Sequence, residues 1–117
     1  MGSYDKYIEG RRKSIKKSLP KDNLIVLEAR KCAQECAMLL VEKFKSKKVY
    51  LFGSVVEGSF RKGSDIDLAV EGLKPKHYFR AIVELYKISN GLKIDLIPLE
   101  SAFYKEEIIK EGELLYG

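Results

Sequence analysis

The chain has 117 residues, of which 45% are hydrophobic and 33% are charged, and its formal net charge is +5. This size and composition are typical of one soluble globular domain. The apolar runs are too short to span a membrane, and the N-terminus lacks the apolar core of a secretion signal. We therefore expect a cytoplasmic protein that does not associate with membranes.

The positive charge is concentrated at the N-terminus. Residues 1–21 contain seven basic residues and two acids, whereas residues 22–117 contain 15 of each. The basic residues of the first segment are Lys6, Arg11, Arg12, Lys13, Lys16, Lys17 and Lys21. We therefore divide the chain into a basic arm, residues 1–21, and a domain, residues 22–117. Such an arm can bind RNA or an acidic partner surface, and it can equally be a solvated tail.

A long helix is the first predicted element. Apolar residues recur every three or four positions, which predicts an amphipathic helix over 23–46 with Asp22 or Asn23 as its N-cap. Cys32 and Cys36 lie on its apolar side. Because no Cys or His cluster elsewhere completes a zinc site, we interpret both cysteines as core residues.

Strands and helices alternate along the rest of the sequence. The pattern predicts, in order, a strand over 49–52, a short helix over 54–57, a polar loop over 58–63, a strand over 65–70, a helix over 76–89, a strand over 92–97 and a helix over 101–111. Gly112 is expected to end the last helix, and the apolar tail at 114–116 is expected to dock on some surface, of this chain or of another. The only histidine, His77, is expected at the surface. The order α-β-α-β-α-β-α predicts an α/β (α+β) fold with a small mixed three-stranded, or slightly larger, sheet backed by helices.

Three aspartates on these strands are the candidate metal ligands. Side chains alternate along a strand, so Asp65 and Asp67 share one face, roughly 6.6 Å apart along the chain. Asp95 lies between two apolar residues that point the other way, so it can join the pair if its strand is adjacent. Three clustered carboxylates repel one another, and Mg²⁺, which prefers oxygen ligands, removes that repulsion.

A glycine and a serine precede these acids. Gly53-Ser54 follows a strand and begins a helix, and ten residues separate Ser54 from Asp65. Glycine lets a phosphate approach the backbone, and the helix N–H groups with the Ser54 hydroxyl can bind it. The combination indicates a two-metal displacement at the α-phosphate of a nucleotide. The alternative is that the aspartates are turn or edge residues without a metal, although strands disfavour aspartate.

The same residues resemble the signature of the DNA-polymerase-beta-like nucleotidyltransferase superfamily. They are Gly53-Ser54, Gly58, Ser64-Asp65-Ile66-Asp67-Leu68 and Ile94-Asp95-Leu96. The short length and the C-terminal residues 108–112 and 115–116 resemble the minimal nucleotidyltransferase (MNT) branch, and the likeness covers residues 24–116. It implies the polymerase-beta-like fold for the domain.

The resemblance also implies roles for single residues. Asp65 and Asp67 would be metal ligands, and Asp95 would be a third, catalytic carboxylate that helps to activate the nucleophile. Gly53, Ser54, Gly58 and Ser64 would form the nucleotide-binding turn and loop. Many relatives carry a basic residue just before the glycine, whereas this chain has Glu57, so Arg61 or Lys62 is expected to supply the positive charge.

The implied activity is that of a nucleotidyltransferase that uses ATP and two Mg²⁺ ions. It would transfer AMP to a hydroxyl of a partner protein, as the antitoxin of a HEPN-domain toxin. Two alternatives stay open. One is an antitoxin that inhibits a HEPN ribonuclease by binding alone, which Glu57 and the apolar tail favour. The other is a nucleotidyltransferase that acts on RNA or a small molecule with a separate acceptor-binding subunit. The tail is also compatible with a homo-oligomer.

Overall fold

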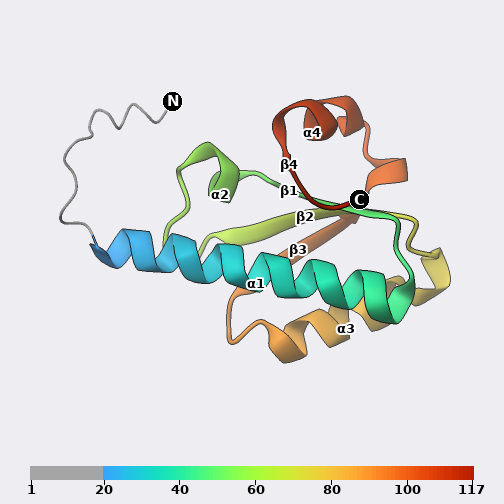
Figure 1. The fold of residues 1–117 in the computed structure, drawn as a ribbon, viewed down its shortest axis with the longest axis horizontal. Coiled ribbons are helices and arrows are strands. Elements are labelled where there is room, and N and C mark those ends of the chain that lie inside the picture. Colours follow the sequence, from blue (N-terminus) through green and yellow to red (C-terminus); the bar gives the residue numbers. More distant parts are fainter. Residues whose placement is uncertain (1–19) are drawn as a thin grey trace.

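The computed structural model of the protein describes residues 20–117, and side chains from residue 24 onward. Four helices and four strands make up this part of the chain (Figure 1). In chain order they are α1 (Pro20–Phe44), β1 (Lys48–Phe52), α2 (Ser54–Glu57), β2 (Asp65–Glu71), α3 (Tyr78–Ile88), β3 (Lys93–Pro98), α4 (Lys105–Glu111) and β4 (Glu113–Tyr116). The predicted order of seven elements is confirmed, and β4 is added to it. No helix in residues 20–117 is long and apolar enough to cross a membrane.

The start of the first helix differs from the sequence prediction. The helix α1 begins at Pro20, so Asp22 and Asn23 lie inside it and are not its N-cap. Proline suits a first helical turn, where its missing N–H has no partner to lose. Residues 1–19, most of the predicted basic arm, lie outside the described residues.

The sheet is mixed and four-stranded, in the order β3-β2-β1-β4. The central strands β1 and β2 are antiparallel, β2 and β3 are parallel, and β4 pairs antiparallel with β1. The predicted apolar tail docks by forming β4, in which Leu114 lies opposite Tyr50. Pairing satisfies backbone groups that would otherwise be left at the edge of β1.

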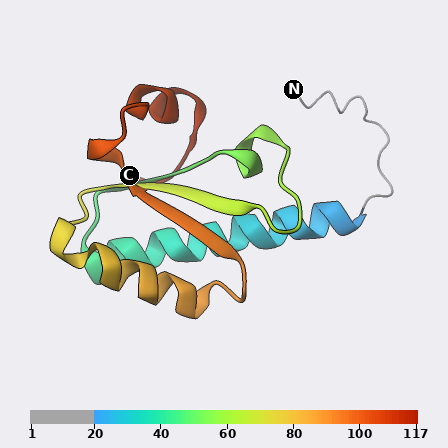
Figure 2. The ribbon, with the colours of Figure 1, turned by 180° about the vertical axis from the view of Figure 1, so that it is seen from behind.

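The main core lies between the sheet and the two helices α1 and α3, which cover the same face (Figures 1 and 2). On β2, Ile66, Leu68 and Val70 are fully buried there, as the alternation predicts. Cys32 and Cys36 are buried free thiols in this core, so their interpretation as core residues is confirmed. Each such apolar side chain contributes about 1.5–3 kcal/mol by leaving water.

The opposite face of the sheet carries a smaller apolar cluster beneath α4. Its buried members are Tyr50, Ala69, Leu99 and Ile108. The helix α4 begins only at Lys105, after a 3-10 turn at Leu99–Ser101, so the predicted start at 101 is wrong. The helix α4 covers only part of this face, and the beginning of β2, where the candidate site lies, stays exposed to solvent.

Two local predictions need correction. His77 is half-buried and not a surface residue: its ring packs against Phe44 with centroids 5.9 Å apart. Gly112 follows α4 as predicted, but in an extended conformation with φ −77° and ψ 176°. A Cβ there would lie 2.5 Å from the carbonyl oxygen of Ile108, so glycine lets the chain pass directly from α4 into β4.

Candidate active site

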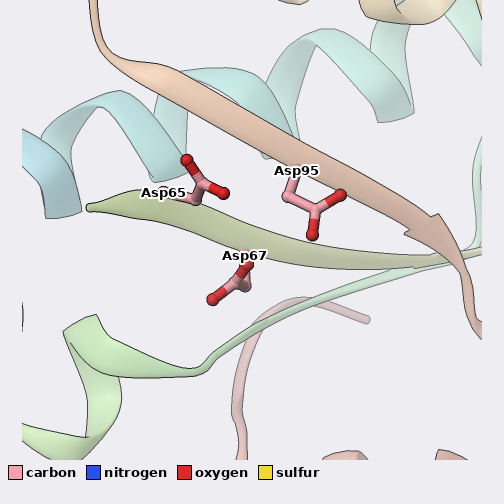
Figure 3. A group of neighbouring side chains, drawn as sticks. All are labelled: Asp65, Asp67 and Asp95. Atoms are coloured by element: carbon pink, nitrogen blue, oxygen red, sulfur yellow. The ribbon is translucent and has the colours of Figure 1, made fainter. Parts of the chain in front are cut away.

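Asp65, Asp67 and Asp95 converge on the open face of the sheet. Asp67 on β2 is the register partner of Asp95 on β3, and Asp65 lies two residues before Asp67 on the same side. One carboxylate oxygen from each residue lies within 4.8 Å of the other two. Figure 3 shows Asp95 pointing from β3 toward the two acids of β2. The predicted convergence of the three acids is therefore confirmed.

The three carboxylates differ in their exposure to solvent. Asp65 and Asp95 are exposed, while Asp67 is half-buried. Burial, together with the negative charges of Asp95, Asp65 and Glu57, raises the pKa of Asp67 to about 6. Hard carboxylate oxygens at this spacing fit Mg²⁺ or a similar divalent ion, whose charge would offset the repulsion.

Gly53 connects this acid cluster to the start of α2. Its backbone has φ 79° and ψ −148°, and a Cβ added to it would overlap Oδ2 of Asp67. Only glycine satisfies both conditions. Ser54 follows as the first residue of α2 and is half-buried. The first N–H groups of a helix have no partner within it, so they are available to a ligand beside Asp67.

The loop before β2 is shaped by Gly58 and Ser64. Gly58 ends α2 in a left-handed conformation, with its N–H donating to the Ser54 carbonyl oxygen at 3.0 Å. The Ser64 hydroxyl accepts a hydrogen bond from the Arg61 N–H at 3.0 Å. Both residues thus brace the loop backbone. Arg61 and Lys62 are exposed in it, and neither joins an ion pair among residues 24–117.

Two neighbours of the acid cluster were missed in the sequence. Lys93 on β3 is the register partner of Asp65, so the parallel pairing brings a cation to the same row of the sheet. The Tyr78 hydroxyl donates to the Leu96 carbonyl oxygen at 2.5 Å. Burial raises the pKa of Tyr78, and the charge of Asp95 raises it further. Side chains alternate along a strand, so Lys93 lies on the same face of β3 as Asp95, and this pattern could have identified it from the sequence. The position of Tyr78 near Asp95 depends on how α3 packs against the sheet.

Comparisons with known proteins agree with this geometry. The sequence profile of the family described as "Polymerase beta, Nucleotidyltransferase" matches residues 34–117. A protein of Methanocaldococcus jannaschii named as a protein adenylyltransferase is 38% identical over 85 residues, which are 67% of this chain and 83% of that protein. The residues matched by the family profile include the turn, the loop and the strands that carry the candidate residues.

Solved structures share the fold. A minimal nucleotidyltransferase structure matches with a TM-score of 0.61 and 25% identity, over 74% of this chain and 92% of that chain. A toxin-antitoxin crystal structure with AMP-PNP matches with a TM-score of 0.59 and 26% identity, over 72% and 73% of the two chains. A structure titled toxin-antitoxin MntA-HepT matches with a TM-score of 0.51 and 25% identity, over 78% and 71%. The chain therefore belongs to the polymerase beta nucleotidyltransferase family, and it is a nucleotidyltransferase.

Proposed function

We propose that this chain is a magnesium-dependent adenylyltransferase that transfers AMP from ATP to a hydroxyl of a partner protein and serves as an antitoxin. The observation that carries the proposal is the pairing of Asp67 with Asp95 beside the Gly53 turn. The likeness to a named protein adenylyltransferase and to toxin-antitoxin structures, one of them with AMP-PNP, supports the choice of ATP and of a toxin as partner. A HEPN-domain protein is the partner that we propose.

We assign a role to each group of site residues from its position. Asp65, Asp67 and Asp95 would hold two Mg²⁺ ions, which neutralise phosphate charge and make the acceptor hydroxyl easier to deprotonate. Gly53 and Ser54 would bind the triphosphate, within the loop that Gly58 and Ser64 brace. Arg61 and Lys62 would add positive charge from that loop.

Asp95 is the carboxylate that we propose to lie nearest the acceptor. It is exposed, and its strand β3 is an outer strand of the sheet, so a partner can approach from that side. In the transfer, the acceptor oxygen forms a bond to the α-phosphorus and the bond from that phosphorus to the β-phosphate oxygen breaks. Pyrophosphate leaves, and the hydroxyl proton passes to Asp95 or to solvent.

Label transfer tests the proposal. The chain is incubated with Mg²⁺, ATP labelled at the α-phosphate, and the protein that co-purifies with it from its source cells. We expect labelled partner with the unaltered chain and none with Asp65→Asn or Asp67→Asn. Glu71→Gln is the matched control, because it removes a half-buried carboxylate from the same strand outside the acid cluster. Equal labelling by all four proteins would refute the catalytic role.

A second candidate is an antitoxin that inhibits by binding alone. Glu57 favours it, because this exposed acid ends α2 next to the loop, and its charge repels phosphate as it does the Asp67 carboxylate. Inhibition of the partner that persists in Asp67→Asn, without label transfer by any variant, would favour this candidate. The RNA alternative depends on the basic arm and stays a prediction, which a salt-sensitive gel shift tests.

A further inference from the structure

A cavity of about 520 Å³ lies between α2 and α4, beside Gly53. Figure 1 shows α4 on the side of the sheet opposite α1. Phe52 and Tyr104 form aromatic walls, with ring centroids 6.3 Å apart, and Val56 and Ile108 add apolar surface. Glu57, Glu107 and Glu111 also line the cavity, which we call the glutamate pocket.

The three carboxylates determine the kind of ligand. Glu107 and Glu111 lie four residues apart on α4, so both acids lie on one side of the helix, and Tyr104, which directly precedes α4, lines the same cavity. Among residues 24–117 the ion pairs of glutamates involve Glu84 and Glu113, and none involves the acids of the pocket. A triphosphate would be repelled here, and a neutral nucleoside would leave three negative charges without a cation. A segment with both basic and apolar side chains fits best.

The chain contains such a segment outside the described residues. Residues 1–19 carry six basic residues and two acids, a net charge of +4, and include Tyr4 and Tyr7. The segment joins α1 at Pro20, and both views place the start of α1 at the end of the molecule where α2 lies (Figures 1 and 2). Nineteen residues can extend about 60 Å, more than the roughly 37 Å length of α1 itself.

We propose that the glutamate pocket binds the basic N-terminal segment of the same chain, residues 1–19. The basic side chains pair with Glu57, Glu107 and Glu111, and the apolar ones contact Phe52 and Tyr104. Such docking brings positive charge next to Glu57, beside the turn proposed to bind the triphosphate. That consequence depends on the proposed function, whereas the docking itself does not.

Carbodiimide cross-linking of the full chain tests the docking without any need for activity. The reagent joins a lysine amine directly to a carboxylate that it contacts, and mass spectrometry then maps the joined residues. We expect cross-links from Lys6, Lys13, Lys16 or Lys17 to the pocket acids, weakened by high salt because the pairs are exposed. The triple variant Glu57→Gln, Glu107→Gln, Glu111→Gln should lower the cross-linking of these lysines at least about fivefold. Glu106→Gln, an exposed acid of α4 that does not line the pocket, should not.

Three outcomes would overturn the proposal. One is cross-links spread evenly over acids on the far side, such as Glu28 and Glu42, with no effect of the triple variant. Another is cross-links found only between copies, which an equal mixture of ¹⁵N-labelled and unlabelled chain distinguishes from links within one copy. The third is that adenosine protects Glu107 and Glu111 from modification by the carbodiimide while no cross-links to residues 1–19 form. That result would assign the pocket to a nucleoside.

Discussion

Gly53 and Asp67 lie so close together that a Cβ on residue 53 would overlap the Oδ2 atom of Asp67. The turn that begins α2 and the central carboxylate of the acid cluster therefore share one small space. Neither can be repositioned without moving the other, because Phe52, the residue before Gly53, is the register partner of Asp67. This contact fixes the distance between the proposed phosphate turn and the proposed metal ligands.

Gly53→Ala should lower the rate of AMP transfer about 100-fold while the protein stays folded. The added methyl displaces the Asp67 carboxylate or the start of α2, and a misplacement of about 1 Å can lower a rate about 100-fold. Gly63→Ala is the matched control, because Gly63 also has a positive φ, 90°, but a Cβ there meets nothing within 4 Å. Label transfer measures the activity of each variant, and circular dichroism shows whether each variant is folded. Equal loss of activity in both variants would show that backbone strain, and not the contact with Asp67, is responsible.

The metal-free protein should lose stability as the pH rises through 6. The pKa of Asp67 is raised from 3.8 to about 6 in the folded state, so that state binds the proton more tightly than the unfolded chain does. Its contribution therefore favours folding below about pH 4 and is lost by about pH 7. Because the side chain is half-exposed, we expect a difference of only about 1 kcal/mol.

Thermal unfolding in a chelator measures this effect. The Tm of Asp67→Asn should exceed that of the unaltered chain near neutral pH, and the gap should close in acid, because asparagine has no proton to lose. A gap that is constant between these conditions would contradict the raised pKa of Asp67.

Magnesium should stabilise the folded chain through the three aspartates. A ligand that binds only the folded state at 100 times its Kd adds about 2.7 kcal/mol, which raises the Tm of a domain of this size by about 10 °C. The Tm increase should disappear in Asp65→Asn and Asp67→Asn and persist in Glu71→Gln. The same increase in all four proteins would place the ion elsewhere.

Leu68→Ala should destabilise the fold by about 2–5 kcal/mol, because it leaves a cavity in the core directly behind the acid cluster. Leu68 is fully buried, whereas Val83 on α3 is 55% exposed, so Val83→Ala should change the stability by less than about 0.5 kcal/mol. Chemical denaturation measures both values. Similar small changes in the two variants would contradict the burial of Leu68.

Local patterns were sufficient to predict the acid cluster and most elements. The alternation along β2 places Asp65 and Asp67 on one face by itself, and the helical period of α1 requires no knowledge of its neighbours. To place Asp95 in the cluster, we had to assume that its strand lies beside β2. The parallel pairing of β2 with β3, in which Asp67 lies opposite Asp95, confirms this assumption.

Features that depend on distant contacts could not be predicted. The strand β4 pairs Leu114 with Tyr50, which is 64 residues earlier in the chain, and so short an apolar run gives no strand signal of its own. The half-burial of His77 depends on Phe44 at the end of α1. The glutamate pocket exists only because α4 folds back beside α2.

Diffraction from crystals soaked with Mn²⁺ and a non-hydrolysable ATP analogue tests the central claim most directly, since manganese scatters anomalously and takes similar oxygen ligands. The account predicts anomalous peaks about 2.0–2.3 Å from carboxylate oxygens of Asp65, Asp67 and Asp95, with the triphosphate against Gly53 and Ser54. A triphosphate bound elsewhere, or manganese that contacts none of the three aspartates, would contradict it.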